Sequence, residues 1–242
     1  MRYERQMLVP QIGPEGQKKL EQSAVTVIGS GCLGSPVLTY LTCAGVRSIR
    51  IIDSSVVSEP DLSCQFLHNT NNLHELKVLS AREKLSQLNP HVHFIPVNKR
   101  LDDENAQGFI AGSDVVVDCS DNQTSAAIVL HACTRLGIPL VTGGAFGFCG
   151  WVATIGRDTP RLSLPNRENG EQRAPVPLLG VTVGIIGSMQ ATECIKLLLG
   201  IGEPLFGRIL NYDGLRGTWE EFRAQQPEDC PAHSRACPVK ED

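Results

Sequence analysis

The chain has 242 residues, of which 41% are hydrophobic and 20% are charged, so it can bury the core of one large α/β domain. Its formal net charge of −4 argues against nucleic-acid binders and anionic-membrane binders, because both depend on a strongly basic face. Residues 1–6 lack the apolar core of a signal peptide, and no apolar run reaches the roughly 18 residues that cross a bilayer. Nine scattered cysteines suit a reducing cytoplasm, where we expect the protein.

A glycine-rich turn follows the first predicted strand, at residues 24–28. Its three glycines, in a Gly-x-Gly-x-x-Gly pattern, are Gly29, Gly31 and Gly34. Such a turn lets the backbone approach a phosphate closely, and N–H groups at the start of the following helix, here 34–44, point at the anion. The next predicted strand, 48–53, ends at Asp53, whose carboxylate is placed to accept hydrogen bonds from ribose hydroxyls. Together these features favour nucleotide binding over a purely structural turn.

Strands and helices continue to alternate through the first 150 residues. Helices are predicted at residues 76–88, 102–111 and 124–136, and strands at 92–97, 114–118 and 138–141. This alternation predicts a doubly wound, mainly parallel, Rossmann-like α/β sheet. In such a sheet the ligand lies at the carboxyl ends of the strands, where the glycine turn also lies.

The pattern changes after residue 150. We expect a strand at 151–155 in an antiparallel extension, a strongly apolar helix at 184–199 and a strand at 207–212. The helix has the composition of an interior or subunit-interface helix. Residues 158–179, rich in proline and arginine, are predicted to form a mobile loop across the site, and residues 224–242 a polar tail. The whole chain, 1–242, is therefore predicted to be a single nucleotide-binding domain.

Further motifs accompany the glycine turn in a fixed order. They are Arg2–Gln6, Asp61–Gln65, Lys77-Val78, Asn89-Pro90, Asp118–Asn122 and Gly184–Ala191. In that order and spacing they closely resemble the E1-like adenylyltransferases typified by MoeB and ThiF, from the first residue to about residue 230. The resemblance implies an enzyme that uses ATP to convert the C-terminal glycine of a ubiquitin-like sulfur carrier protein into an acyl-adenylate. Sulfur would then enter a cofactor, such as molybdopterin or thiamine, or another metabolite.

The resemblance also implies roles for single residues. The three glycines would shape the nucleotide turn, the acid that ends the second strand would hold the ribose, and Asp61 and Gln65 would line the same site. Lys77 would contact the phosphates and Asp121 would hold Mg²⁺ beside them. Arg5 would reach in from the partner subunit of a homodimer. Such a site needs no general base, because a carboxylate nucleophile is already ionised near neutral pH.

Three of these assignments have a simpler alternative. For Lys77, at the start of a predicted helix, the alternative is a solvated side chain with no contact to a phosphate. Arg5 lies near the amino terminus, where arginine is usually a surface charge. Asp121 precedes a predicted helix and would serve as its N-cap, a role that is compatible with metal binding.

The chain departs from the family pattern beside the predicted phosphates. Family members usually carry Asn-Leu-x-Arg-Gln where residues 61–65 read Asp-Leu-Ser-Cys-Gln. An amide is replaced by the acid Asp61 and a guanidinium by the thiol of Cys64, a change of about two charge units in the direction that disfavours phosphate binding. We therefore expect adenylation to be weakened or to rely on another cation. Candidate replacements in the predicted mobile loop are Arg161, Arg167 and Arg173.

The zinc site of the family is incomplete in this chain. Relatives hold a structural zinc with two Cys-x-x-Cys pairs, but residues 159–162 contain no ligand here. Cys230, His233 and Cys237 offer only a partial site, and structural zinc takes four ligands, so we do not expect zinc. The loop cysteine that ThiF-like members use in sulfur transfer is also absent near residues 173–175. Adenylation alone, as in MoeB, therefore fits the sequence better than a covalent sulfur-transfer step.

The sequence leaves three functions to compare. The first is an adenylyltransferase that uses ATP and Mg²⁺, acts on a sulfur carrier ending in Gly-Gly and works as a homodimer. The second is a catalytically weakened relative that binds the carrier or ATP as a scaffold, which the changes at residues 61 and 64 favour. The third is an NAD-dependent oxidoreductase, because the glycine turn and Asp53 would serve that cofactor equally well. The second half of the chain, however, offers no clear hydride-transfer pair.

Overall fold

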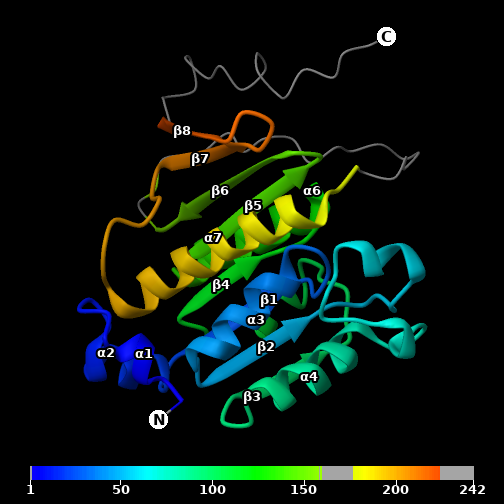
Figure 1. Cartoon of the computed structure of the whole chain (residues 1–242), viewed down its shortest axis with the longest axis horizontal. Coiled ribbons are helices and arrows are strands. Elements are labelled where there is room, and N and C mark those ends of the chain that lie inside the picture. The colour runs from blue at the N-terminus through cyan, green and yellow to red at the C-terminus, as the bar shows by residue number, and fades with distance from the viewer. Residues whose placement is uncertain (1, 158, 160–176, 224–242) are drawn as a thin grey trace.

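The chain folds around one eight-stranded sheet in the order β3-β2-β1-β4-β5-β6-β7-β8 (Figure 1). The computed structural model describes residues 2–157, 159 and 177–223. The strands are β1 (Ala24–Ile28), β2 (Ser48–Ile52), β3 (His93–Val97), β4 (Val115–Asp118), β5 (Leu140–Phe146), β6 (Cys149–Ile155), β7 (Arg208–Asp213) and β8 (Thr218–Arg223). The first five strands in this order, β3, β2, β1, β4 and β5, are parallel to one another. Strands β6, β7 and β8 follow β5, and each is antiparallel to its neighbour. This topology confirms the predicted doubly wound, mainly parallel sheet with an antiparallel C-terminal extension.

Helices connect the strands of the sheet. The α-helices are α1 (Glu4–Met7), α2 (Gly13–Leu20), α3 (Gly34–Ala44), α4 (Lys77–Leu88), α5 (Ala106–Ile110), α6 (Gln123–Leu136) and α7 (Gly180–Leu199), and the 3₁₀ turns are η1 (Glu59–Ser63) and η2 (Thr70–Asn72). Helices α3, α6 and α7 each end at a glycine in the left-handed conformation, Gly45, Gly137 and Gly200. A glycine C-cap satisfies the last carbonyl groups of a helix without a Cβ penalty. These helix ends were therefore predictable from the sequence.

Helices cover both faces of the parallel strands. Side chains of a strand alternate between the two faces of a sheet. Val27 and Ile51 therefore belong to the larger core beneath α3, α4 and α7, while Ile28 and Ile52 belong to a second core with α5 and α6. Figure 1 shows α3, α4 and α7 on the face toward the viewer and α6 behind the sheet. Burial on both faces explains why these strands read as continuous apolar runs.

Helix α7 packs on the sheet beside α3. It begins at Gly180, four residues earlier than predicted, so its apolar stretch is longer than the sequence indicated and would suffice to cross a membrane by length and composition alone. In this fold 44% of that stretch is buried. At Gly187 a Cβ would overlap the Pro36 ring of α3, and Glu193 of α7 accepts a hydrogen bond from Thr154 of β6 at 2.9 Å. We therefore interpret α7 as a packing helix of this domain.

Strand β5 and helix α5 also differ from their predicted bounds. Strand β5 runs to Phe146, whereas the prediction ended at residue 141, because its antiparallel pairing with β6 continues through Gly143 and Gly144. A Cβ at Gly144 would lie 2.6 Å from the indole nitrogen of Trp151, so glycine is the residue that fits. Helix α5 begins at Ala106 rather than near 102, since the Asp102 carboxylate accepts backbone N–H groups in a turn before the helix.

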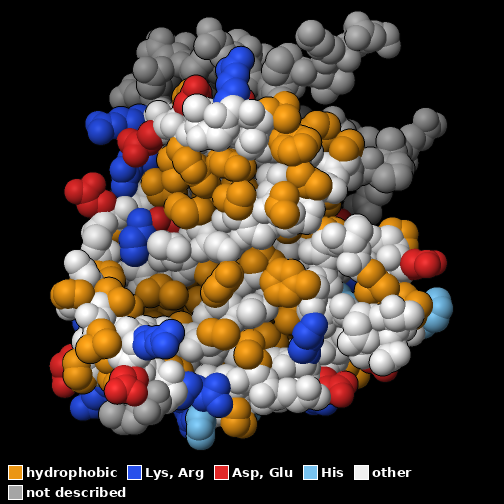
Figure 2. Space-filling model, viewed as in Figure 1, with side chains coloured by type: hydrophobic (Ala, Val, Ile, Leu, Met, Phe, Trp, Pro, Cys, Tyr) orange, Lys and Arg blue, Asp and Glu red, His pale blue; other side chains and the backbone are white. Residues whose placement is uncertain are grey.

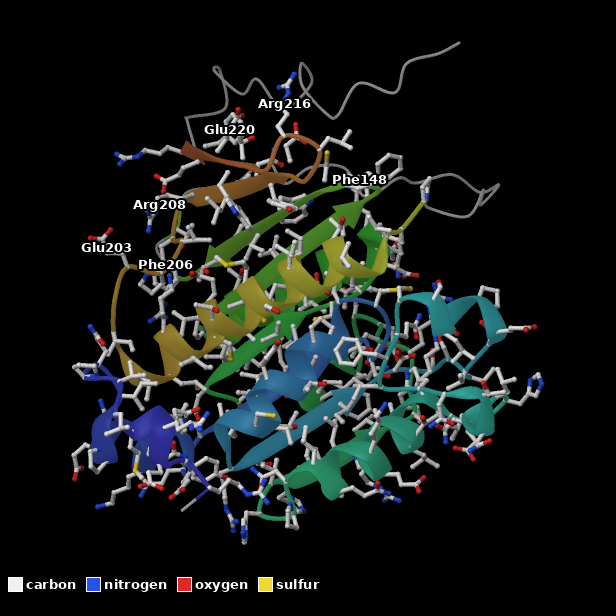
Figure 3. All side chains as sticks on the ribbon, in the orientation of Figure 1. Phe148, Glu203, Phe206, Arg208, Arg216 and Glu220 are labelled. Atoms are coloured by element: carbon white, nitrogen blue, oxygen red, sulfur yellow. The ribbon has the colours of Figure 1, made fainter. Side chains whose placement is uncertain are left out.

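Strand β8 was not predicted. It is an exposed edge strand that pairs with β7 after a short turn, and exposed strands carry little apolar periodicity. Arg208 at the start of β7 donates hydrogen bonds to Glu221 of β8 at 2.9 Å and to the Glu203 carbonyl oxygen at 3.1 Å. Figure 3 shows Glu203, Phe206 and Arg208 together at one end of these strands. The predicted polar tail, 224–242, and the predicted mobile loop, except residues 159 and 177–179, lie outside the described residues.

Candidate nucleotide site

The glycine turn lies at the switch point of the sheet. The strand order reverses between β1 and β4, and the segments that follow both strands leave from the same edge of the sheet (Figure 1). These two segments are in contact, because a Cβ at Gly29 would lie 2.8 Å from the Cys119 carbonyl oxygen. Ligands of doubly wound sheets bind in the crevice at this point.

The three glycines of the turn differ in what surrounds them. Gly29 has φ +91° and its N–H donates to the Ile52 carbonyl oxygen at 2.8 Å, so it makes the tight bend after β1. A Cβ at Gly34 would overlap the Gly29 carbonyl oxygen, so Gly34 allows α3 to start against the turn. A Cβ at Gly31 would meet only the Gln65 amide, at an ordinary contact distance of 3.5 Å. Packing therefore requires glycine at 29 and 34, while at Gly31 a Cβ would make only an ordinary contact with the Gln65 side chain.

Asp53, which follows β2, stabilises the glycine turn through hydrogen bonds. One carboxylate oxygen accepts hydrogen bonds from the Ser30 N–H at 2.9 Å and from the Ser30 hydroxyl at 3.1 Å. The other accepts from the Ser55 N–H at 2.8 Å. The acid that ends β2 therefore has a structural role that the sequence did not indicate. Its side chain is half-buried at the same edge of the sheet as the turn.

Lys77, Asp61 and Gln65 form one polar cluster beside the turn. The Lys77 ammonium lies 3.0 Å from the Asp61 carboxylate, and the Gln65 amide donates to the other Asp61 oxygen at 2.7 Å. Burial opposes ionisation of Asp61, but hydrogen bonds from Ser58 and the charge of Lys77 outweigh it and lower the Asp61 pKa. Lys77 is therefore a buried, ion-paired residue, and its interpretation as a solvated side chain is wrong. Cys64 lies between Asp61 and Gln65 in the sequence, so it belongs to the same loop as these two residues of the cluster.

Asp121 lies in the loop between β4 and α6. Its side chain is exposed and accepts a hydrogen bond from the Asn122 amide at 3.1 Å. The N-cap of α6 is Asn122, whose side-chain oxygen accepts the Ser125 N–H at 2.8 Å. The N-cap interpretation of Asp121 is therefore wrong, because the next residue takes that role. An exposed carboxylate at the carboxyl edge of the sheet has oxygen atoms available to a cation.

Asp118 and Gln190 fix this loop from within the core. The buried Asp118 carboxylate accepts the Ser120 N–H at 3.0 Å and the Thr142 hydroxyl at 3.2 Å. The buried Gln190 amide of α7 donates to the Asp118 carbonyl oxygen at 2.9 Å. Both residues belong to motifs that were visible in the sequence, but the sequence did not indicate that they contact each other across 72 positions.

The buried side chain of His68 stabilises the glycine turn through a hydrogen bond to Ser30. The His68 Nε2 lies 3.1 Å from the Ser30 carbonyl oxygen, and its Nδ1 lies 2.9 Å from the Ser80 hydroxyl. Nε2 must therefore carry the proton and Nδ1 accept one from Ser80. Burial lowers the pKa of His68, which favours this neutral form. No sequence motif marks His68, so sequence reasoning missed it.

Arg5 lies away from these residues. It is an exposed residue of α1, a helix that the sequence did not predict. Its neighbour Gln6 donates to the Ala44 carbonyl oxygen at 3.1 Å, and Asn89 donates to the Tyr3 hydroxyl at 2.8 Å. These contacts hold α1 at the ends of α3 and α4, at the opposite edge of the sheet from the glycine turn (Figure 1). The structure thus brings together the glycine turn, Asp53, Asp61, Gln65 and Lys77. Asp121 lies two residues beyond Cys119, which contacts the turn, and Arg5 lies apart.

Metal-ligating clusters are not found in the described part of the chain. Among residues 2–157, 159 and 177–223, no group of three or more His, Cys, Asp or Glu side chains is arranged to hold a metal ion. The partial zinc ligands Cys230, His233 and Cys237 lie outside the described residues. So do the candidate replacement cations Arg161, Arg167 and Arg173. These assignments stay predictions.

The comparisons with known proteins agree on one family. The profile of the ThiF family matches residues 3–232. The SAMP-activating enzyme E1 of Haloferax volcanii is 40% identical over 235 residues, which cover 95% of this chain and 87% of that protein. The sulfur carrier protein adenylyltransferase of Thermus thermophilus is 37% identical over 243 residues, which cover 95% of this chain and 89% of that protein.

Solved structures agree on the fold. The crystal structure of Escherichia coli MccB with ATP matches with a TM-score of 0.83 at 18% identity, covering 96% of this chain and 74% of that chain. At this identity the likeness supports the Rossmann-like architecture alone. The sequence matches extend over almost the whole chain, and they leave the oxidoreductase alternative without support. The chain belongs to the ThiF family of E1-like adenylyltransferases.

Proposed function

We propose that this protein uses ATP to adenylate the C-terminal carboxylate of a ubiquitin-like sulfur carrier protein that ends in Gly-Gly. Two full-length relatives carry names of this activity, a sulfur carrier protein adenylyltransferase and a SAMP-activating enzyme. The observation that carries the proposal is the glycine turn at the switch point of the sheet, where Gly31 is in contact with Gln65 of the Lys77 cluster. We further propose that the adenylate serves sulfur incorporation into a cofactor or metabolite, in the cytoplasm.

The proposed reaction depends on positioning and on neutralising charge. The carrier carboxylate, with an ordinary pKa of about 3.3–3.7, is ionised at neutral pH. It attacks the α-phosphorus of ATP, so that a carboxylate oxygen–phosphorus bond forms. The bond from this phosphorus to the bridging oxygen breaks, and pyrophosphate leaves with the electron pair. Backbone N–H groups of the turn would hold the phosphates. Lys77 would neutralise their charge once its ion pair with Asp61 has opened.

Mg²⁺ fits the residues at this edge of the sheet. Magnesium usually keeps several waters and is held by one or two carboxylates together with substrate phosphates. The exposed Asp121 carboxylate is such a ligand, which explains why a complete protein cage is not needed. When bound, the ion would neutralise charge on the pyrophosphate. We propose that Asp121 holds it beside the triphosphate.

A homodimer would complete the site. Arg5 lies at the opposite edge of the sheet from the turn, so within one subunit it has no contact with the other candidate residues. Figure 2 shows hydrophobic side chains gathered over α3, α7 and the neighbouring strands. Val181, Ile185 and Met189, spaced four residues apart on α7, are exposed or half-buried, and Tyr40 of α3 is 52% exposed. We propose that this face pairs with a second copy, whose Arg5 reaches the phosphates.

One observation favours a second function. The Asp61–Lys77 ion pair removes the positive charge that a triphosphate needs, and Cys64 stands where the resemblance implies arginine. A protein with this pair would bind the carrier or ATP as a scaffold without efficient adenylation. The variant Cys64→Arg separates the two functions. It should raise pyrophosphate exchange if the missing guanidinium limits catalysis, and it should leave a pure scaffold inactive.

The intact mass of the carrier tests the proposed reaction directly. The purified protein is incubated with ATP, Mg²⁺ and Gly-Gly-ended carriers encoded near its gene, and the carrier should gain the mass of an adenylyl group, which is AMP less one water. Lys77→Ala should weaken ATP binding about tenfold by calorimetry, and Asp121→Ala should abolish the adduct. Lys99→Ala, which changes an exposed lysine after β3, is the matched control and should behave as the wild type. Near-normal adduct formation in both site variants would contradict these assignments.

A further inference from the structure

Two cysteines face each other across the candidate nucleotide site. Cys32 lies within the glycine turn, between Gly31 and Gly34, and Cys64 follows η1. Their sulfur atoms are 2.6 Å apart, although the residues are 32 positions apart in the sequence. Both residues are half-buried rather than fully enclosed. The contact therefore joins two separate elements of the chain at the edge of the core.

The surroundings of Cys64 make its thiol the more reactive of the two. The hydrogen bond from the Cys32 thiol is the largest influence and lowers the pKa of Cys64 to about 7. Burial and the charge of Asp61 raise this pKa, but a hydrogen bond from Ser63 and the charge of Lys77 lower it as well. The contact with Cys64 and burial raise the pKa of Cys32. At neutral pH about half of Cys64 is then thiolate, the form that attacks disulfides, while Cys32 keeps its proton.

We propose that Cys32 and Cys64 form an oxidation site, which a low-molecular-weight disulfide such as glutathione disulfide converts to an intramolecular disulfide. The Cys64 thiolate attacks one sulfur of glutathione disulfide, and one glutathione thiolate leaves. The Cys32 thiol loses its proton to water and attacks the Cys64 sulfur of the mixed disulfide, which releases the second glutathione. Two cysteine thiols are thereby oxidised by two electrons, and one glutathione disulfide is reduced to two thiols.

The disulfide would close the candidate nucleotide site, a consequence that rests on the proposed function. The Gln65 amide covers Gly31, where a Cβ would lie 3.5 Å from it, and donates to the Cys32 sulfur at 3.6 Å. A covalent bond at Cys64 would hold Gln65 in that position, so that the turn and residues 59–65 cannot separate to admit phosphates. We expect ATP to bind at least about tenfold more weakly to the oxidised protein, and reduction to restore binding.

Peptide mapping of the whole protein in glutathione buffers tests the oxidation site. Trypsin leaves Cys32 on the peptide 20–47, together with Cys43, and Cys64 on the peptide 51–77. Under oxidising buffer these two peptides should be joined by a bond that dithiothreitol cleaves. The joined species should persist in Cys43→Ser and disappear in both Cys32→Ser and Cys64→Ser. Cys43 is the matched control because it is exposed and lies on the same peptide as Cys32.

Three results would overturn the proposal. In the first, alkylation of Cys32 and Cys64 is as complete in oxidising buffer as in reducing buffer. In the second, Cys64 is joined to Cys230 or Cys237 instead of Cys32. In the third, the disulfide forms but calorimetry gives the same ATP affinity before and after reduction, which contradicts the closing of the site. If the reduced protein binds no ATP at all, the proposed function fails, while the peptide map still decides whether the disulfide forms.

Discussion

Asp61 is the single residue that most changes the charge of the candidate nucleotide site. Its carboxylate lies 3.0 Å from the Lys77 ammonium and also accepts a hydrogen bond from Gln65. A triphosphate that approaches Lys77 must therefore compete with a carboxylate that is already bound there. The charge loss expected from the sequence thus takes the form of an ion pair, which occupies the lysine that phosphates need.

Asp61→Asn should strengthen ATP binding. The amide keeps an oxygen that can accept hydrogen bonds from Ser58, but it removes the charge that holds Lys77. Because a partly buried ion pair of this kind is worth about 1 kcal/mol, we expect an ATP affinity about fivefold higher. Calorimetry with Mg²⁺ and ATP measures the ATP affinity of the variant and of the wild type. Glu59→Gln removes the same charge from an exposed position in η1 and should have no effect; equal affinities in both variants would contradict the competition.

The reactivity of Cys64 should depend on pH near neutrality. Its pKa of about 7 makes the thiolate fraction rise through that pH, whereas burial raises the pKa of Cys43. Alkylation by iodoacetamide, followed by mass spectrometry, should therefore reach half of its maximal rate near pH 7 at Cys64 and only at higher pH at Cys43. Cys32→Ala removes the hydrogen bond that lowers the pKa, so its Cys64 should react more slowly at pH 7. An unchanged profile would contradict this cause.

The glycine turn is the element that joins the fold to the site. Its position after a buried strand, the helix that follows and the acid at the end of β2 were all predicted from the sequence, because glycine spacing and apolar runs are local features. The local pattern did not separate the glycines that packing requires from the glycine where a Cβ would make only an ordinary contact. In the structure, a Cβ at Gly34 would overlap the backbone, whereas a Cβ at Gly31 would make an ordinary contact with a side chain.

Two alanine variants of the turn should have different effects. Gly34→Ala places a methyl group on the Gly29 carbonyl oxygen, so we expect it to lower the free energy of unfolding by about 2–4 kcal/mol. Gly31→Ala meets only the Gln65 side chain and should unfold like the wild type, yet bind ATP at least about tenfold more weakly. Urea unfolding and calorimetry measure these quantities. Loss of stability in Gly31→Ala with normal ATP binding would reverse the two roles.

Contacts between distant elements were beyond prediction from the sequence. The Asp61–Lys77 pair, the His68–Ser30 bond and the Gln190–Asp118 bond each join segments that only the tertiary fold brings together. The sequence placed charged groups near the phosphates but did not pair them with each other. Edge strand β8 escaped prediction for another reason, since its exposed residues follow no apolar pattern.

At the scale of the whole molecule, the candidate residues lie at two edges of the sheet. The glycine turn, Lys77 and Asp121 lie at the carboxyl edge, and Arg5 lies at the amino edge on α1. A single subunit of this shape does not bring Arg5 to a phosphate. The apolar face of α3 and α7 offers a surface on which a second copy can pack (Figure 2).

Mixing two inactive variants tests the shared site. Arg5→Ala and Asp121→Ala should each be inactive alone. In a homodimer with Arg5 acting across the interface, half of the dimers in an equal mixture are hybrids with one intact site, so the mixture should recover about a quarter of the wild-type rate. Pyrophosphate exchange after subunit exchange measures it. Full activity of Arg5→Ala alone, or no recovery from hybrids seen by native mass spectrometry, would contradict the shared site.

The most direct test of the central claim is ATP–pyrophosphate exchange by the purified, reduced protein, with and without Gly-Gly-ended carriers. The proposed function predicts exchange that needs both Mg²⁺ and one carrier, and that is lost when the terminal carboxylate of that carrier is amidated. Carrier-independent exchange, or no exchange from a protein that binds both ATP and a carrier, would contradict the claim. The second of these results would favour the scaffold function.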